Sequence, residues 1–429
     1  MSDRTRHSYL GSIVIIGILF FIFGFVTWLN GPLITFVKYA FDLNDINAFL
    51  VLTVFYLSYF FLALPAASIL RRTGMKRGMS LGLFIMALGA VAFGEFVLRR
   101  WYPGALAGLF TIGAGLALLQ TAANPYISIV GPIEGAAQRI AVMGICNKAA
   151  GALAPYVFGM LVLAGIDSFG AQLAGADVAT RETLLDNFAA RVRLPYLAMA
   201  ALLALLAVFV LRSPLPDIRS EDVNAAPASG STRGTSLFSF PHVWLGALCI
   251  FVYVGAEVMA GDAIGTYGRG FDLPVGETRY FTTFTLIAML AGYLCGLLTI
   301  PRFISQERYL TWSALLGVLL VIGAFLTRGY VSVGFVAALG FANAMMWPAI
   351  FPLAIEGLGR LTERGSALLV MGICGGAIVP QLFALLKQSM NFQTVFLILM
   401  VPCYLYIWFY ATRGHKAGLR HAVAPPRPA

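Results

Sequence analysis

The stretch Gly113-Ala-Gly-Leu-Ala-Leu-Leu-Gln120-Thr-Ala-Ala-Asn124-Pro125-Tyr126 places two side-chain amides inside a long apolar segment. Gln120 and Asn124 are four residues apart, so they share one face if the segment is helical. Pro125 lacks a backbone N–H and leaves the carbonyl one turn earlier without its helical partner. Lipid offers no hydrogen bonds, so such groups must face protein or a water-filled cavity. We therefore expect this helix to line a polar cavity.

The composition indicates a membrane protein. Of the 429 residues, 59% are hydrophobic and 11% are charged, whereas soluble domains have roughly 45–50% apolar and about 25% charged residues. The mean hydropathy is +0.84. A helix needs roughly 20 apolar residues to span a bilayer. Twelve runs meet this length, at about 10–38, 46–70, 78–98, 104–130, 138–165, 194–212, 239–267, 278–300, 309–327, 330–357, 365–387 and 393–412.

The charge distribution argues against a nucleic-acid partner. The formal charge is +10, but the basic residues form short clusters between apolar runs, as in cytoplasmic loops. More of them fall on the side of the N-terminus, although Arg99 and Arg100 are exceptions. We therefore expect both termini in the cytoplasm. The five cysteines all lie inside apolar runs and form no CxxC pair, so we expect no metal site or disulfide.

The chain divides into two halves of six spans each. The stretch Asn224-Ala-Ala-Pro-Ala-Ser-Gly-Ser-Thr-Arg-Gly-Thr is small, polar and rich in Gly, Pro and Ser, which is typical of a flexible linker. It predicts an N-terminal bundle over 1–212, a cytoplasmic linker over 213–237 and a C-terminal bundle with a short cytoplasmic tail over 238–429. A second long loop, about 165–193, is expected outside the cell with a short helix.

The halves repeat each other. Val142-Met-Gly-Ile-Cys146 recurs letter for letter as Val370-Met-Gly-Ile-Cys374, in the fifth span of each half. In the fourth spans, Asn124-Pro125 aligns with Trp347-Pro348. Two parallel repeats joined by a cytoplasmic linker predict an all-α membrane protein of twelve transmembrane helices in two pseudo-symmetric six-helix bundles. This is the major facilitator fold, with its substrate site near the midplane between the halves.

Several runs resemble the fucose–galactose–glucose:proton symporter family of the major facilitator superfamily. They are Phe23-Gly-Phe-Val-Thr-Trp-Leu-Asn30, Leu119-Gln-Thr-Ala-Ala-Asn-Pro-Tyr126, Gly255-Ala-Glu-Val258, Trp347-Pro-Ala-Ile-Phe-Pro-Leu-Ala-Ile-Glu-Gly-Leu-Gly359 and Gly365-Ser-Ala-Leu-Leu-Val-Met-Gly-Ile-Cys-Gly-Gly-Ala-Ile-Val-Pro380. The resemblance implies sugar uptake across the inner membrane of a bacterium, driven by a proton gradient.

The chain departs from this family at two positions where relatives resemble proton carriers. Members commonly read Leu-Asn-Asp in the first span, and this chain reads Leu29-Asn30-Gly31. The fucose carrier has Glu before its TAANP block, and this chain has Gln120. Neither position is titratable here, so sodium coupling and facilitated diffusion stay open beside proton coupling. The smaller, neutral Gly31 favours a substrate with an N-acetyl group, N-acetylglucosamine, with glucose as the alternative.

Charged residues inside spans are candidate functional groups because they are costly in lipid. Lys148 lies in the fifth span, and Glu257 and Asp262 lie in the seventh. Each is a candidate for proton coupling or for a structural ion pair. Lys148 and Glu257 both lie in the middle of their spans. We therefore consider that they form an ion pair that couples proton movement to transport. Near the cytoplasmic face, Glu356, Arg360, Arg71 and Arg72 are candidates for a gate.

The amides and aromatic residues are the candidates for binding substrate. Amide side chains both donate and accept hydrogen bonds, as sugar hydroxyls do. The amides in spans one, four, five and ten are Asn30, Gln120, Asn124, Asn147 and Asn343. Isolated amides more often form interhelical hydrogen bonds. Trp28, Trp347 and Phe351 have the ring faces on which a pyranose stacks, although single aromatic residues are more often packing.

Together these patterns predict a secondary transporter that imports a neutral sugar by alternating access between the halves. We expect no cofactor or metal, since the sequence has no nucleophile–base set, metal-ligand cluster or phosphate loop. We also expect the protein to be a monomer. A membrane enzyme would need catalytic carboxylates or histidines at an interface, and a sensor or scaffold would have a large soluble domain; the sequence has neither.

Overall fold

The computed structural model describes residues 3–129, 136–215, 236–358 and 361–418, and it is built of helices throughout these ranges. Twelve helical segments in the described part are long and apolar enough to span a membrane. The fold class predicted from the sequence is therefore confirmed. The elements are α1 (Asp3–Trp28), α2 (Asn30–Ala40), α3 (Asp45–Ala48), α4 (Leu50–Thr73), α5 (Met75–Leu98), α6 (Tyr102–Ile129), α7 (Ala136–Leu161), α8 (Ile166–Gly175), α9 (Val178–Ala190), α10 (Arg193–Arg212), η2 (Leu237–Ser239), α12 (Pro241–Gly261), α13 (Ile264–Arg269), α14 (Val275–Thr278), α15 (Phe281–Thr299), α16 (Gln306–Leu326), α17 (Gly329–Asn343), α18 (Met346–Ile355), α19 (Thr362–Met371), η4 (Gly372–Cys374), α20 (Gly375–Leu386), α21 (Phe392–Thr412) and η5 (Gly414–Lys416).

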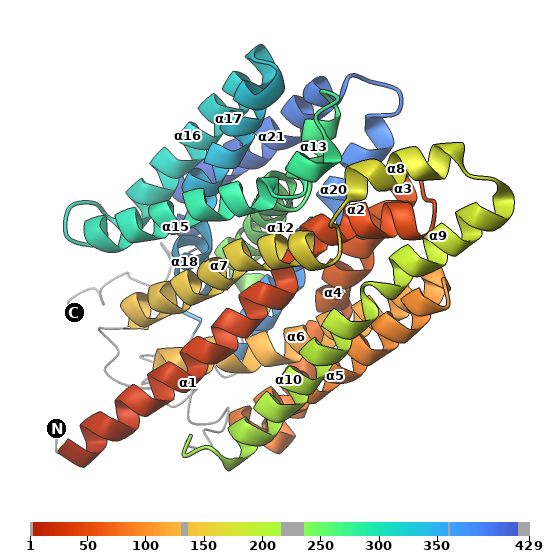
Figure 1. The fold of residues 1–429 in the computed structure, drawn as a ribbon. Helices are drawn as coiled ribbons and strands as arrows, with labels where there is room; N and C mark the ends of the chain where they lie inside the picture. Colours follow the sequence, from red (N-terminus) through yellow and green to blue (C-terminus); the bar gives the residue numbers. More distant parts are fainter. Residues whose placement is uncertain (1–2, 130–135, 216–235, 359–360, 419–429) are drawn as a thin grey trace, which may run out of the picture.

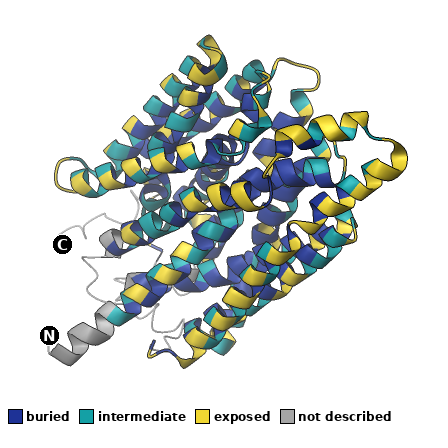
Figure 2. Cartoon of the chain, viewed as in Figure 1, coloured by how far each residue is buried: buried dark blue, intermediate teal, exposed yellow. Residues whose placement is uncertain are grey.

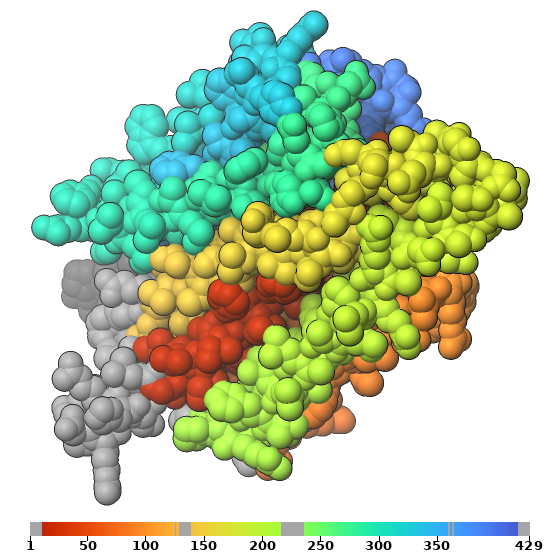
Figure 3. Space-filling model, in the orientation of Figure 1, coloured from red at the N-terminus to blue at the C-terminus, as the bar shows by residue number. Residues whose placement is uncertain are grey.

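The spans form two bundles, with helices α1 to α10 in the first and α12 to α21 in the second (Figure 1). Helix α10 ends at Arg212 and η2 begins at Leu237. Most of the predicted linker, residues 216–235, lies outside the described residues, so the limits of 1–212, 213–237 and 238–429 stay predictions. Between the bundles, α15 lies along α7 (Figure 3). Helices α19 and α20 pack on α4.

Glycine lets helices of one bundle approach closely. In the stretch that opens the sequence analysis, a Cβ on Gly113 would lie 2.5 Å from the carbonyl oxygen of Phe55, and one on Gly115 would lie 2.4 Å from that of Gly82. The first contact brings α6 against α4 and the second brings it against α5. Small residues have this role in membrane proteins, where packing rather than water drives helix association. Large apolar side chains such as Leu88, Leu205 and Leu298 remain exposed, as lipid-facing positions require. Exposed positions follow the outer faces of the helices (Figure 2).

Four spans are interrupted along their length. The first changes from α1 to α2 at Leu29, the seventh from α12 to α13 at Asp262 and Ala263, and the tenth from α17 to α18 at Ala344 and Met345. The eleventh changes from α19 to α20 through the 3-10 turn η4. In the first span the break precedes Gly31-Pro32, where proline lacks the N–H that a continuous helix needs. Spans one and seven correspond between the two halves, so their breaks lie at equivalent places.

The long loop predicted at 165–193 is mostly helical. It forms α8 and α9, and α9 leads almost directly into α10, which begins at Arg193, one residue before the predicted start of the sixth span. Asp177 caps α9 by accepting a hydrogen bond from the Thr180 N–H at 3.3 Å. Hydrogen bonds from Thr180 lower the pKa of this exposed carboxyl.

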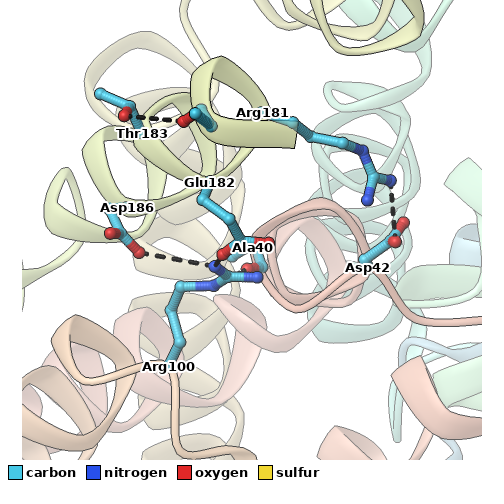
Figure 4. A network of polar contacts seen from close by, with 8 residues as sticks. Ala40, Asp42, Arg100, Arg181, Glu182, Thr183 and Asp186 are labelled. Atoms are coloured by element: carbon cyan, nitrogen blue, oxygen red, sulfur yellow. Dashed lines mark hydrogen bonds and ion pairs between the residues drawn. The ribbon is translucent and has the colours of Figure 1, made fainter. Parts of the chain in front are cut away.

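Ion pairs hold α9 over the neighbouring helices. The Arg100 guanidinium binds the carboxylates of Glu182 and Asp186, and Arg181 binds Asp42 at 2.8 Å (Figure 4). Arg100, an exception to the charge bias in the sequence, is thus neutralised by acidic residues that follow much later in the chain. We refer to this face of the molecule as the α8–α9 side and to the opposite face, where α1 begins and α21 ends, as the terminal side.

Candidate functional site

A cavity of about 130 Å³ lies between the two bundles, next to the broken spans. A water molecule needs about 10–15 Å³ of such free space, so the cavity has room for several. The cavity is lined from both halves by Phe20, Phe23, Thr27, Trp28, Tyr56, Tyr59, Gln120, Asn124, Ile140, Gly144, Asn147, Lys148, Tyr253, Val254, Glu257, Tyr293, Trp347, Pro348 and Ile373.

One ion pair crosses this cavity. The Lys148 ammonium on α7 lies 2.9 Å from Glu257 Oε1 on α12, and the two side chains are only 9% and 12% exposed. The Tyr253 hydroxyl, one turn earlier on α12, donates to the same oxygen at 2.8 Å. The ammonium also lies 4.5 Å from the centre of the Trp28 ring, within the range of a cation–π contact. The pair suggested by the sequence therefore exists, and each of its charges has two partners.

The amides of α6 and α7 lie at the cavity wall. Gln120 and Asn124 both line the cavity from α6, one turn apart on the face predicted for them. The Gln120 side chain donates to the Tyr59 hydroxyl at 3.2 Å. Asn147 donates to the carbonyl oxygen of Phe20 at 3.4 Å. The cavity wall thus carries neutral groups that both donate and accept hydrogen bonds.

Two cavity residues have a buried polar atom without a hydrogen-bond partner. These atoms are Thr27 Oγ1 and Trp28 Nε1. The indole of Trp28 is held between the halves, because a Cβ on Gly151 or on Gly261 would lie only 2.4 Å from its ring. Buried polar groups are nearly always paired. A ligand with hydroxyl groups would provide the missing partners.

Other predicted binding residues are directed elsewhere. Asn343 is fully buried and accepts a hydrogen bond from the Tyr404 hydroxyl at 2.8 Å, within the C-terminal bundle. Asn30 is buried in the first span outside the cavity lining. Phe351 stacks on Trp347 at 5.6 Å between ring centres, and only Trp347 reaches the cavity. In this conformation the structure does not bring Asn30, Asn343 or Phe351 to the cavity wall.

Three of the four gate candidates lie on the terminal side. Arg71 and Arg72 are exposed at the end of α4, and Arg71 donates to Ser68 Oγ at 3.3 Å. Glu356 is exposed, and its carbonyl oxygen contacts His242 Nε2 at 2.9 Å. Arg360 lies outside the described residues. A gate formed by these residues stays a prediction.

Four tyrosines are the main cavity residues that sequence reasoning missed. Tyr56 and Tyr59 come from α4, Tyr253 from α12 and Tyr293 from α15. Spans two and eight have an amide or a charged residue only near one end, at Asn47 and Arg279, so the sequence gives no reason to assign their middles to the site. The spacing of Tyr253 four residues before Glu257 was a usable signal, because it places both on one helix face.

On the α8–α9 side, an ion pair and hydrogen bonds connect the two halves. Asp45 of the N-terminal half binds Lys38 at 2.5 Å and also binds Lys387 of the other half. Gln381 donates to the carbonyl oxygen of Ile46 at 3.2 Å and accepts from Thr53 at 3.1 Å. These contacts close the α8–α9 side in this structure.

Comparison with known proteins identifies the family. The sequence pattern of the Major Facilitator Superfamily matches residues 16–380. The chain belongs to this superfamily. It is therefore a multi-pass membrane transporter and not an enzyme, and its twelve helices have the arrangement that transporters of this superfamily share.

Two relatives and one solved structure place the chain more closely within the superfamily. A glucose/galactose transporter of Brucella abortus is 32% identical over 96% of both chains. The L-fucose-proton symporter of Escherichia coli is 29% identical over 94% of this chain and 93% of its own. The solved structure of FucP in the outward conformation is 26% identical, has a TM-score of 0.74, and covers 95% of this chain and 99% of its own. The resemblance to the fucose–galactose–glucose:proton symporter family is thus confirmed.

Proposed function

We propose that this transporter imports a neutral hexose together with protons across a bacterial inner membrane. The observation that carries the proposal is the cavity between the halves. Its wall combines amides, tyrosine hydroxyls and indole rings with unpaired polar atoms on Thr27 and Trp28. Its one ion pair has no net charge. Such a wall complements a molecule that has many hydroxyl groups and an apolar ring face, and no charge of its own.

The names of the relatives support the same substrate class. The Brucella abortus relative is a glucose/galactose transporter, and the Escherichia coli relative is an L-fucose-proton symporter. The positive-inside bias of the loops supports cytoplasmic termini, which makes the α8–α9 side the external one. The closed α8–α9 side then corresponds to a state that cannot exchange sugar with the outside.

The sequence argument for N-acetylglucosamine loses its support in this structure. It assumed that the missing side chain at Gly31 leaves room beside the sugar ring. A Cβ on Gly31 would instead lie 2.7 Å from Thr282 Oγ1 and 3.2 Å from Asp262 Oδ1, and Gly31 is not part of the cavity wall. We therefore propose glucose or galactose as the substrate and keep N-acetylglucosamine as a competitor in the test.

A counterflow assay tests the proposal directly. Purified protein in liposomes is loaded with unlabelled sugar, and the entry of labelled glucose, galactose, fucose or N-acetylglucosamine is measured. We expect rapid exchange of glucose or galactose and slower exchange of N-acetylglucosamine. Absence of exchange with every sugar would refute sugar transport. Repeating the assay with an imposed pH gradient and with a sodium gradient identifies the coupling ion, and accumulation driven by sodium alone would refute proton coupling.

A further inference from the structure

Asp262 differs from every other carboxylate near the cavity because it has no cation. It lies in the break between α12 and α13 and is only 2% exposed. None of the ion pairs among the described residues includes it. Its Oδ2 accepts a hydrogen bond from the Tyr56 hydroxyl of α4 at 3.3 Å. Its Oδ1 has no hydrogen-bond partner, although the backbone N–H of Gly31 acts on the carboxyl.

Asp262 faces the break of the first span across the interface between the halves. Its Oδ1 lies only 3.2 Å from where a Cβ of Gly31 would be, so the absence of a side chain at Gly31 leaves the space in which this carboxyl lies. The neighbouring Thr282 hydroxyl donates to the carbonyl oxygen of Gly261 at 2.8 Å, so it is not available to Asp262. Three segments, α2, α4 and the start of α15, therefore enclose the carboxyl when the α8–α9 side is closed.

The charged and titratable groups that act on Asp262 are Tyr56 on α4, Glu257 on its own helix and Lys148 on α7. Lys148 is already paired with Glu257. Tyr56 donates one hydrogen bond but has no positive charge to offer. An ionised carboxylate at Asp262 would thus be buried without a counterion, which is costly in a protein interior.

We propose that Asp262 binds the transported proton, and that the external side closes over this carboxyl only when it is neutral. This inference rests on the proposed function. A proton from external water binds the Asp262 carboxylate and forms the O–H of the neutral acid, after which the two halves close around it. Because the neutral acid tolerates burial and the carboxylate does not, the proton changes the relative free energy of the closed and open states.

Tyr56 connects this carboxyl to the cavity. Its ring lines the cavity and its hydroxyl contacts Asp262. In the closed state the proton leaves the acid O–H for water in the cavity, next to Tyr56. The resulting carboxylate is buried without a counterion, which raises the free energy of the closed state. The external side therefore opens again. Glu257 keeps its lysine and its tyrosine throughout, so it holds the binding site together rather than carrying the proton.

The Asp262→Asn variant tests the assignment, because asparagine resembles the neutral acid but cannot release a proton. In liposomes we expect counterflow of glucose at a rate similar to that of the unmodified protein. We also expect the accumulation ratio under an imposed pH gradient to fall to about 1, and sugar entry to cause no alkalinisation outside. The control is Asp272→Asn, since Asp272 is exposed and asparagine tolerates its positive φ of 60°.

Two results would overturn the proposal. The first is that the Asp262→Asn variant still accumulates sugar under a pH gradient. The second is that the same variant loses counterflow although it still binds sugar in detergent. If the unmodified protein exchanges no sugar at all, the proposed function fails instead. If it exchanges sugar without moving protons, sugar transport stands and the role of Asp262 fails.

A chemical test avoids any effect of substitution on folding. Dicyclohexylcarbodiimide reacts with protonated carboxyl groups in apolar surroundings, and the acid adds across the reagent to form a stable N-acylurea. With unmodified protein in liposomes, we expect peptide mass spectrometry to find the adduct on Asp262, less at alkaline pH. Adduct on Glu257 with none on Asp262 would assign the proton to the other carboxyl.

Discussion

Glu257 and Asp262 lie five residues apart in one span, yet their surroundings differ completely. Glu257 lies at the cavity with a lysine and a tyrosine on the same oxygen. Asp262 lies in the break of the span with one tyrosine and an unpaired oxygen. The first arrangement gives the carboxylate a cation, and the second leaves Asp262 without one, as the proposed proton site requires. In a low-dielectric interior the number and kind of partners, and not the residue type, decides which role a carboxyl can have.

Removing Lys148 should have the largest effect, because Glu257 then loses its cation and is left without a counterion, as Asp262 is. Lys148→Ala leaves Glu257 buried with only Tyr253 as a partner. We expect a loss of about 3–5 kcal/mol in the free energy of unfolding, as for other broken buried pairs, and loss of counterflow. Thermal unfolding in detergent measures the first and liposome exchange the second.

The double variant Lys148→Met/Glu257→Gln is the matched control for this loss. It removes both charges and keeps the volume nearly constant, so we expect most of the stability to return while sugar exchange stays impaired. If the Lys148→Ala variant unfolds at the same temperature as the unmodified protein, then Lys148 does not stabilise Glu257, and the contrast between Glu257 and Asp262 fails.

An amide at the cavity wall should have an intermediate effect, on binding and not on coupling. Gln120→Ala removes one hydrogen-bonding group from the proposed sugar site. We expect a loss of about 0.5–1.5 kcal/mol, which corresponds to about 2- to 10-fold weaker sugar binding, while the accumulation ratio at saturating sugar is unchanged. Titration calorimetry with glucose measures the affinity.

Gln172→Ala is the control for this variant, because Gln172 is an exposed amide on α8. It should bind sugar like the unmodified protein. Unchanged affinity in Gln120→Ala would remove α6 from the proposed sugar site.

Exposed carboxylates should show the smallest effect. Glu182 and Asp186 share the Arg100 guanidinium, but their side chains are 57% and 66% exposed. Surface ion pairs contribute about 0–1 kcal/mol. We therefore expect Arg100→Ala to lower the melting temperature by no more than a few degrees and to leave sugar exchange unchanged. A large loss of exchange would show that α9 takes part in closing the external side.

Much of the site could be predicted from the sequence because its residues are costly in lipid. Gln120, Asn124, Asn147 and Lys148 were recognised as polar groups within apolar spans, and all of them line the cavity. Asn343 has the same signature but is satisfied by Tyr404 inside one bundle. A single sequence cannot distinguish these cases, since both a partner side chain and a cavity satisfy an amide.

The sequence by itself determined that this chain spans a membrane twelve times in two related halves, because apolar length and loop charge act locally along the chain. It also determined which residues had to avoid lipid. Only the tertiary structure decided how those residues meet. Helices far apart in sequence bring Lys148 to Glu257 and place Asp262 beside Gly31. The environment of a buried charge depends on every helix around it, and this environment exists only after the halves have packed together.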